Sequence, residues 1–224
     1  MPQTHDTVLF MYPAACSRVT MCALEEAGIT YDAQLVNIGK MKNKEPAYLA
    51  LNPKGKVPAL RIGGRVMTEN TAILWFLHEE NPQAGLLPHS DDPAETNGFL
   101  ADVAWCGGTL HPIVRQIRAP AKYTTMDPAG VAADGTLKFA HECESFEARL
   151  SGGRWWYGAS WSIVDVYLYW CYNTVEKSGF PVSNYPALAD HAARVRARPC
   201  FQRALAKEQA ILTEARAELP EMHL

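Results

Sequence analysis

The stretch NPKGKVPAL, residues 52 to 60, joins a short helical segment to a predicted strand. Pro58 opens the apolar run of that strand. Because proline has no N–H to contribute to a sheet, it is favoured at the first residue of a strand or on an edge. Two interpretations are open, an ordinary trans junction and a cis Val57–Pro58 bond that turns the backbone of Val57 outward toward a ligand. Cis bonds occur in only about 5–6% of X–Pro pairs, so the dipeptide alone favours the ordinary junction.

The pattern of apolar residues around this loop predicts a small α/β unit. Residues 7–12 and 30–36 are typical of strands, and residues 15–29 between them of a helix, which together form a βαβ unit with a parallel strand pair. A short helical segment precedes the loop, and two strands joined by a two-glycine turn and a further helix follow it. These elements are predicted at 45–51, 58–62, 65–68 and 69–81.

The rest of the chain predicts helices and no strand. Residues 83–93 have the Gly, Pro and Asp content of a linker. Helices are predicted at about 94–118, 131–150, 163–178, 186–197 and 199–216. The sequence therefore predicts an α/β domain at 1–82, a linker at 83–93 and an all-helical domain at 94–224.

Composition limits the classes of partner. The net charge of −3 provides no basic field for nucleic acid or an anionic membrane surface. The first ten residues lack the basic and apolar regions of a secretory signal, and no apolar run approaches the roughly 18 residues of a membrane helix. The six cysteines form no Cys-x-x-Cys pair and no metal-ligand cluster. We expect a soluble, cytoplasmic protein without a bound metal.

The order of these elements and motifs resembles the cytosolic glutathione transferases, over nearly the whole chain. NPKGKVPAL is similar to the family's cis-proline loop, and TENTAI (68–73) takes the place of its Glu-Ser pair. WSIVDVYLYW (161–170) is similar to the buried N-capping box of the family's helical domain, and LFMYPAACSRV (9–19) resembles most the bacterial beta class. The resemblance implies a thioredoxin-like N-terminal domain, a helical C-terminal domain, glutathione as co-substrate and a homodimer.

The resemblance also implies a glutathione site. In the family, the main chain of the residue before the cis-proline, here Val57, pairs with the cysteinyl part of glutathione, a form of strand addition. Glu69 would receive the ammonium of the ligand, and Asn70 with its backbone would hold the γ-glutamyl carboxylate at a helix N-terminus. Asn70 departs from the usual serine, and helix capping is the structural alternative for the pair.

Lysines that precede the short helical segment at 45–51 are candidates for binding the glycyl carboxylate of glutathione. The family's lysine aligns with Met41, so the resemblance implies that Lys40 or Lys42 substitutes for it. Solvated surface charge is the alternative for both. Lys54 and Lys56 are interpreted as surface charges.

Candidates for the second substrate lie elsewhere. His111 and Arg115 are four residues apart, which places them on one face of a predicted helix. The resemblance sets this helix beside the family's electrophile pocket, which would then favour anionic or hydrophobic electrophiles. A solvated or subunit-contact face is the alternative. Tyr12, at the end of the first strand, is a weaker candidate for the same pocket wall.

Ser162 and Asp165 have the spacing of a capping box, in which a serine caps the helix and an acid reaches back to the backbone. Their role is structural in either interpretation.

Cys16 and Ser17 are the candidate catalytic residues. They begin a helix after a strand, where backbone N–H groups and the helix dipole favour an anion and lower a thiol pKa below the ordinary value of about 8.5. In one version Ser17 and the helix terminus activate glutathione, and Cys16 only lines the site. In the other version, which we prefer, Cys16 forms a mixed disulfide with glutathione. The remaining cysteines are expected to be inert.

The expected function is conjugation of glutathione to small electrophiles. A glutathione-dependent thiol-disulfide reductase, or a lyase that cleaves ethers or removes halogens through Cys16, is the enzymatic alternative. A non-catalytic relative that binds protein partners is the alternative from another class.

Overall fold

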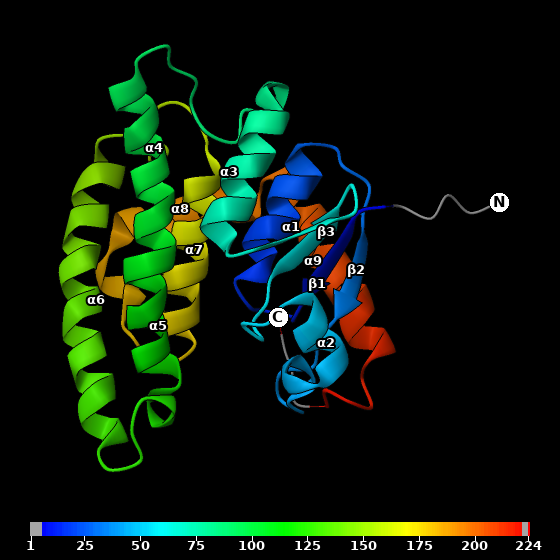
Figure 1. Ribbon diagram of the computed structural model, residues 1–224. Coiled ribbons are helices and arrows are strands. Elements are labelled where there is room, and N and C mark those ends of the chain that lie inside the picture. Colours follow the sequence, from blue (N-terminus) through cyan, green and yellow to red (C-terminus); the bar gives the residue numbers. More distant parts are fainter. Residues whose placement is uncertain (1–5, 221–223) are drawn as a thin grey trace. The chain divides into compact units, whose positions relative to one another are not determined.

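The computed structural model describes residues 6–220 and 224 and divides them into two compact units (Figure 1). The first unit comprises the described residues of Met1–Leu86 and Arg198–Leu224, and the second comprises Leu87–Ala197. The order of elements along the chain follows the predicted order throughout.

A four-stranded sheet forms the centre of the first unit. Its strands are β1 (Val8–Met11), β2 (Asp32–Leu35), β3 (Ala59–Ile62) and β4 (Arg65–Thr68), in the spatial order β2-β1-β3-β4. β1 pairs parallel with β2, while β3 is antiparallel to both β1 and β4. Helix α1 (Ser17–Glu26) connects the parallel pair. The predicted βαβ unit and the thioredoxin-like fold are confirmed.

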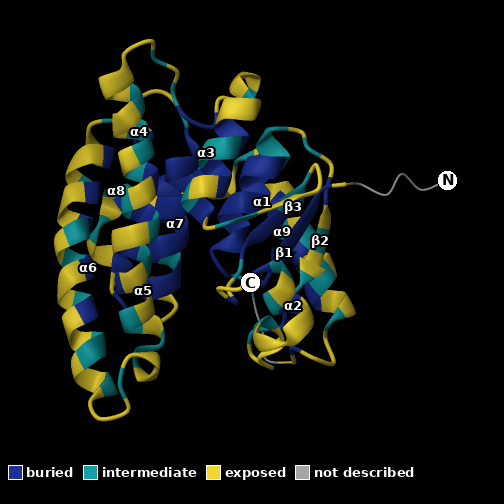
Figure 2. Ribbon diagram, viewed as in Figure 1, coloured by how far each residue is buried: buried dark blue, intermediate teal, exposed yellow. Residues whose placement is uncertain are grey.

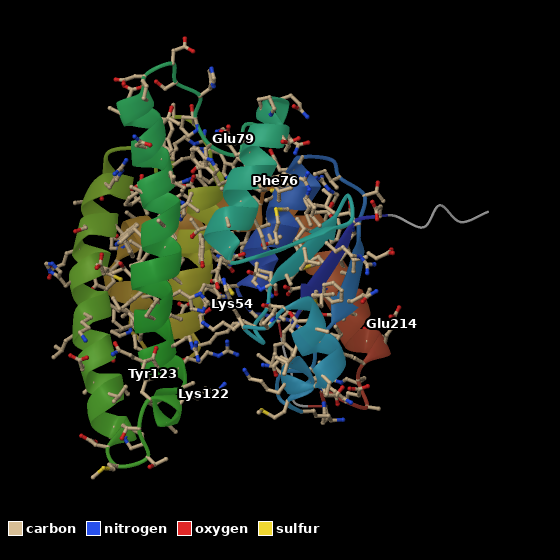
Figure 3. All side chains as sticks on the ribbon, in the orientation of Figure 1. Lys54, Phe76, Glu79, Lys122, Tyr123 and Glu214 are labelled. Carbon is tan, nitrogen blue, oxygen red and sulfur yellow. The ribbon has the colours of Figure 1, made fainter. Side chains whose placement is uncertain are left out.

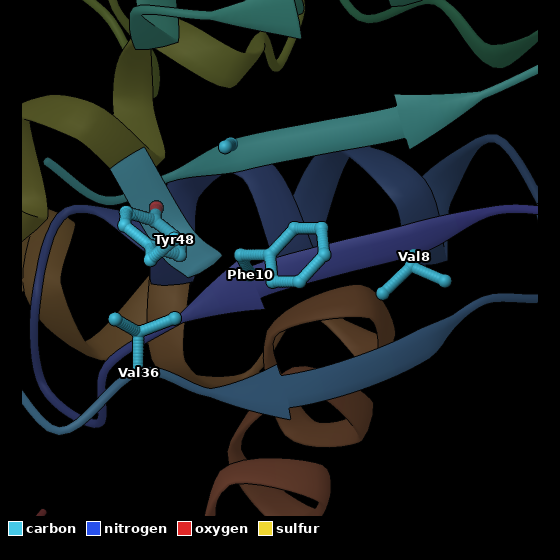
Figure 4. Close-up of a cluster of buried hydrophobic side chains, with 5 residues drawn as sticks. Val8, Phe10, Val36 and Tyr48 are labelled. Atoms are coloured by element: carbon cyan, nitrogen blue, oxygen red, sulfur yellow. The ribbon is translucent and has the colours of Figure 1, made fainter. Parts of the chain in front are cut away.

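The two faces of β1 build two parts of the core. Val8 and Phe10 belong to a buried cluster with Val36, Tyr48 and Ala59, in which the rings of Phe10 and Tyr48 lie 6.0 Å apart (Figure 4). Tyr48 comes from helix α2 (Pro46–Leu51). The alternating residues of the strand point to the opposite face, on which α1 lies. The core therefore fixes β1 and, with it, the loop that follows.

Helix α3 (Asn70–Glu80) follows β4, and helix α9 (Pro199–Glu214) completes the first unit by packing against α1 and β2. The sequence-based boundaries placed residues 199–216 in the helical domain, whereas the structure groups them with the α/β unit. The apolar face of α9 was recognisable from the sequence, but a periodic pattern does not say which surface that face will cover.

Five α-helices of the second unit are α4 (Pro93–Trp105), α5 (His111–Arg118), α6 (Pro128–Ser151), α7 (Ile163–Glu176) and α8 (Pro186–Arg196). A π-helical segment, Cys106–Leu110, divides the predicted helix 94–118. Short 3₁₀ segments lie at Lys42–Lys44, Pro82–Ala84, Pro120–Lys122 and Val182–Asn184.

Helix α7 is buried along nearly all of its length (Figure 2). Within the described residues, no helix is both long and apolar enough to cross a bilayer.

The predicted capping box begins α7. Asp165 Oδ2 accepts hydrogen bonds from the Ser162 N–H at 2.8 Å and from the Ser162 hydroxyl at 3.0 Å. Its Oδ1 accepts from the Trp156 N–H at 2.7 Å and lies 2.8 Å from His191 Nε2, while His191 Nδ1 lies 2.8 Å from the Tyr172 hydroxyl. Asp165 thus satisfies a buried network larger than the two-residue box that the sequence indicated.

Candidate active site

Cys16 lies between β1 and α1, as the N-cap residue of that helix. Its thiol lies 3.8 Å from the carbonyl oxygen of Val57, to which it can donate a hydrogen bond. The Cys16 residue is 6% exposed. Two of the predicted site residues, 41 positions apart in the chain, are thus in direct contact.

Ser17, the other candidate catalytic residue, is fully buried. Its hydroxyl donates to the Tyr12 carbonyl at 3.0 Å and accepts from the Tyr12 N–H at 3.3 Å. These bonds fasten the end of β1 to the first turn of α1. Ser17 therefore stabilises the loop that carries Cys16, and which of the two residues acts on the glutathione sulfur stays a prediction.

Tyr12 is itself buried, although it was a candidate for the pocket wall. It packs in an apolar cluster with Ala15, Leu212 and Leu219. Leu212 lies on α9 and Leu219 follows it, so residues from the end of the chain cover the loop that carries Cys16.

The Val57–Pro58 bond is cis, which excludes the ordinary trans junction, and pairing of the Val57 backbone with a ligand stays a prediction. The loop before it is held from within the unit. Asn52 Nδ2 and the Tyr48 hydroxyl both donate to the Lys56 carbonyl, at 2.8 and 2.6 Å. Neither Asn52 nor Tyr48 was singled out from the sequence. The Asn-Pro dipeptide at residues 52–53 was the available signal, because asparagine commonly bonds to the backbone of a turn.

Gly55 has a positive φ of 58°, and its carbonyl accepts from Asn43 Nδ2 at 2.7 Å. A Cβ atom at this position would lie 2.8 Å from the Asn43 carbonyl oxygen. The close approach of these two backbone segments therefore requires glycine. The hydrogen bond from Asn43 holds the loop beside the Lys42–Lys44 segment.

Glu69 precedes α3 with a φ of 72°, and its half-exposed carboxylate lies 2.8 Å from Lys54 Nζ. Lys54, which is labelled in Figure 3, was interpreted from sequence as a surface charge, and its side chain is indeed half-exposed. It also forms an ion pair with Glu69, the residue expected to receive the ligand's ammonium. The two residues are 15 positions apart, a separation at which sequence spacing predicts no contact.

Asn70 differs from the expectation that its side chain would hold a ligand carboxylate. The residue is buried, its Oδ1 accepts from the Thr20 hydroxyl at 2.6 Å, and its Nδ2 donates to the Cys16 carbonyl at 3.0 Å. The amide is directed into the unit because it bridges α1 and α3. Asn70 therefore supports the backbone of Cys16.

Lys40 and Lys42 are both exposed. Lys42 Nζ lies 2.7 Å from Glu45 Oε1, and this contact raises the pKa of Lys42. Met41 between them has a φ of 59° and is 60% exposed. Both lysines are thus surface cations on one short loop, and a role in binding the glycyl carboxylate stays a prediction.

His111 and Arg115 belong to the second unit. His111 Nδ1 lies 3.4 Å from the Tyr167 hydroxyl, and its ring centroid is 4.6 Å from that of Trp170. Arg115 is exposed one turn further along α5. Their spacing on one helix is as predicted, and their role toward a substrate stays a prediction.

The remaining cysteines, Cys22, Cys106, Cys143, Cys171 and Cys200, are buried and form no disulfide among the described residues. Burial raises the pKa of Cys22 and Cys106, and it raises the pKa of Cys143 and Cys200 to about 12. These four thiols are therefore poor nucleophiles. In the described part of the chain, no group of three or more His, Cys, Asp or Glu residues could hold a metal ion.

Comparisons with known proteins identify the family. The glutathione S-transferase N-terminal domain model matches residues 14–80, and the C-terminal domain model matches residues 137–208. The glutathione S-transferase GstA of Escherichia coli O157:H7 is 30% identical over 215 residues, which cover 89% of this chain and 98% of GstA. The chain belongs to the glutathione S-transferase family.

Other proteins that are similar to this chain carry different names. A maleylpyruvate isomerase from Ralstonia is 28% identical and covers 81% of this chain and 88% of its own length. The disulfide-bond oxidoreductase YfcG of Escherichia coli K12 is 27% identical, with 90% of this chain and 95% of YfcG covered.

Solved glutathione transferase structures share the fold over nearly the whole chain. A glutathione transferase homologue from Sulfitobacter, with bound glutathione, has a TM-score of 0.82, 25% identity and coverage of 91% of this chain and 99% of its own. The beta class glutathione S-transferase of Sphingomonas chungbukensis has a TM-score of 0.79 and 28% identity, covering 90% and 98% of the two chains.

Proposed function

We propose that this protein binds glutathione as co-substrate and transfers its thiolate to a small electrophile. The observation that carries the proposal is the contact between the Cys16 thiol and the Val57 carbonyl, at the N-terminus of α1. That terminus favours an anion, so it would stabilise a thiolate of either Cys16 or glutathione. A structural neighbour with bound glutathione at 25% identity supports the choice of co-substrate.

Each part of glutathione has a candidate partner in the first unit. The main chain of Val57 would pair with the cysteinyl residue, and the Glu69 carboxylate would receive the ammonium in exchange for Lys54. The N–H groups in the first turn of α3, which begins at Asn70, would hold the γ-glutamyl carboxylate. Lys40 or Lys42 would attract the glycyl carboxylate.

The electrophile would be small and hydrophobic or anionic. His111 and the exposed Arg115 are the candidates that would favour negative charge on it. The buried Tyr12 is a weaker candidate, because its ring packs in the apolar cluster with Ala15.

A thiol-exchange reaction through Cys16 is the second candidate function. The Cys16 thiolate would attack a disulfide, form a mixed disulfide with one half and release the other half as a thiolate. A glutathione thiolate would then attack the mixed disulfide and restore the Cys16 thiolate. The position of Cys16 and the similarity to YfcG support this reaction, while the similarity to an isomerase supports glutathione-assisted isomerisation.

The deciding experiment compares Cys16→Ala with Ser17→Ala for conjugation to aryl halides and for reduction of a glutathione mixed disulfide. We expect Cys16→Ala to abolish disulfide reduction and the glutathione adduct in the intact mass. Ser17→Ala should chiefly lower thermal stability, because Ser17 bonds both backbone groups of Tyr12. A Cys16→Ala variant that keeps both activities would contradict a catalytic role for Cys16.

Retention on immobilised glutathione separates the enzyme from a protein-binding scaffold. We expect retention, and failure to bind at millimolar glutathione would favour the scaffold.

A homodimer is also proposed, and a light-scattering mass near the 24.8 kDa of one chain would contradict it. The six cysteines, which form no disulfide among the described residues, support a reducing compartment, the cytoplasm, as the place of action.

A further inference from the structure

Glu208 is a carboxylate on α9 whose side chain is fully buried. Its Oε2 accepts from Arg18 Nε at 3.0 Å and from Arg18 Nη2 at 2.5 Å. The same oxygen lies 3.4 Å from the Ala14 N–H, which donates to it. One carboxylate oxygen of the last helix thus contacts both α1 and the loop before it, 194 residues away in the chain.

The loop that Glu208 contacts is the one that presents Cys16. Ala14 lies two residues before Cys16 and has a φ of 57°, in the left-handed region that disfavours residues with a Cβ. Such a conformation persists only where the surroundings hold it. The bond from the Ala14 N–H to Glu208 is one such contact.

Apolar contacts reinforce this polar contact from the same segment. Leu212 and Leu219 pack against Tyr12 and Ala15, on either side of Ala14 in the sequence. The C-terminal segment therefore contacts the Cys16 loop through both a carboxylate and an apolar surface.

Stability alone gives a poor reason for a buried carboxylate here. Replacing a buried ion pair by apolar groups of similar volume is often neutral or stabilising, because desolvation offsets the attraction. Glu208 Oε1, moreover, has no hydrogen-bond partner among the described residues. Holding α9 onto α1 would require only apolar contacts, whereas holding a backbone N–H requires an acceptor.

We propose that Glu208 is a positioning residue for Cys16, with Arg18 neutralising the buried charge while Glu208 fixes the Ala14 amide. The inference rests on the proposed catalytic role of Cys16. The last helix then belongs to the active-site machinery of the first unit. In physical terms, loss of the acceptor would let the loop relax and would turn the Cys16 thiol away from the N–H groups in the first turn of α1.

The test measures alkylation of Cys16 by iodoacetamide as a function of pH, with the labelled peptide quantified by mass spectrometry. Glu208→Leu, which removes the acceptor, should raise the pH midpoint toward that of an ordinary thiol, about 8.5. It should also speed hydrogen exchange in residues 12–18. Glu208→Gln keeps the acceptor and should leave exchange within about threefold of wild type without raising the midpoint. Where Glu208→Leu does not fold, Glu208→Asp replaces it, because the shorter side chain keeps the charge and withdraws the acceptor.

Arg203→Met is the matched control on the same helix. Arg203 binds Glu25 near the other end of α1, which a rise of about 1.5 Å per residue places roughly 13 Å from Cys16 along the helix axis. This variant should loosen α9 and leave the midpoint unchanged. The inference is overturned if the variant lacking the acceptor keeps the wild-type midpoint, or if Arg203→Met shifts it equally. Because alkylation needs no glutathione, these outcomes are distinguishable from failure of the proposed function.

Discussion

Gly55 shows how one residue holds the loop that carries Val57. An alanine there would have to adopt a φ near 58°, and its Cβ would lie 2.8 Å from the Asn43 carbonyl oxygen. We expect Gly55→Ala to lower the free energy of unfolding by about 1–2 kcal/mol for the left-handed conformation, plus about 1–3 kcal/mol for the steric conflict. Urea unfolding measures the loss.

Gly85 is the matched control for this prediction, because its φ is 59° and a Cβ there would meet nothing within 4 Å. Gly85→Ala should therefore cost only the conformational part. Equal losses in the two variants would mean that the Asn43 segment yields easily, and that the loop is less tightly held than the contacts indicate.

Residue-scale geometry also explains why the site was only partly predictable. The cis bond was implied only by the resemblance of the loop to the family's cis-proline loop, because the dipeptide alone favoured a trans junction. The place of Cys16 at a helix N-terminus could be inferred from the local strand-to-helix pattern. The inward orientation of Asn70 could not, because its partners Thr20 and Cys16 are 50 and 54 residues away. Local spacing identifies a helix N-terminus, but it does not predict which distant residues will form hydrogen bonds with the side chains there.

At the scale of elements, the start of α7 depends on Asp165. Its carboxylate caps the helix and accepts from Trp156, beside a buried His191. Asp165→Ala would leave these donors buried without an acceptor. We expect a loss of about 3–5 kcal/mol, as when one partner of a buried charged network is removed, measured by urea unfolding.

Asp92→Ala is the comparison for this prediction. Asp92 caps α4 by accepting from the Ala94 N–H at 2.8 Å, but it is exposed. Its removal should cost about 1 kcal/mol, the usual value for an N-cap. A loss at Asp165 no larger than this would show that the buried network adds nothing to simple capping.

The contact of α9 with α1 should make stability depend on pH through Glu25. Burial alone would raise the pKa of Glu25, but hydrogen bonds from Lys207 and Arg203 outweigh it and lower the pKa below 4.5. A carboxyl whose pKa is lower in the folded state stabilises the fold above its unfolded pKa, and this contribution is lost as the pH falls through the folded pKa. We expect the free energy of unfolding to fall below about pH 4.5.

The double variant Arg203→Met/Lys207→Met tests this dependence. Without the two cations, burial dominates, and the acid-induced loss of stability should become smaller. Urea unfolding between about pH 6 and pH 3 measures the slope in both proteins. An unchanged slope would assign the acid sensitivity to other carboxylates.

At the scale of the whole molecule, the segment that begins at Arg198 belongs to the first unit, although the whole second unit precedes it in the chain. Removing residues 198–224 would expose the face of α1 that α9 covers, together with Arg18 without its carboxylate. We expect hydrogen exchange to lose protection throughout the first unit, and less in Leu87–Ala197. Protection lost chiefly in Leu87–Ala197 would contradict this assignment and support the sequence-based boundaries.

The resemblance of the loop to the family implied the cis bond, which the dipeptide alone did not favour. The sequence by itself determined the order of the elements, the capping box and the position of the nucleophile candidate at the start of α1. These features are encoded in periodicity and in motifs a few residues long, where the chain itself fixes which atoms can meet. Only the tertiary structure decided that Lys54 pairs with Glu69, that Asn70 supports Cys16 and that Glu208 contacts Ala14. The last contact spans 194 residues, and a charged residue within an amphipathic helix gives no local sign of its partner. The contact forms only after the apolar faces of α9 and α1 have packed, because packing brings the Glu208 side chain beside the Ala14 backbone.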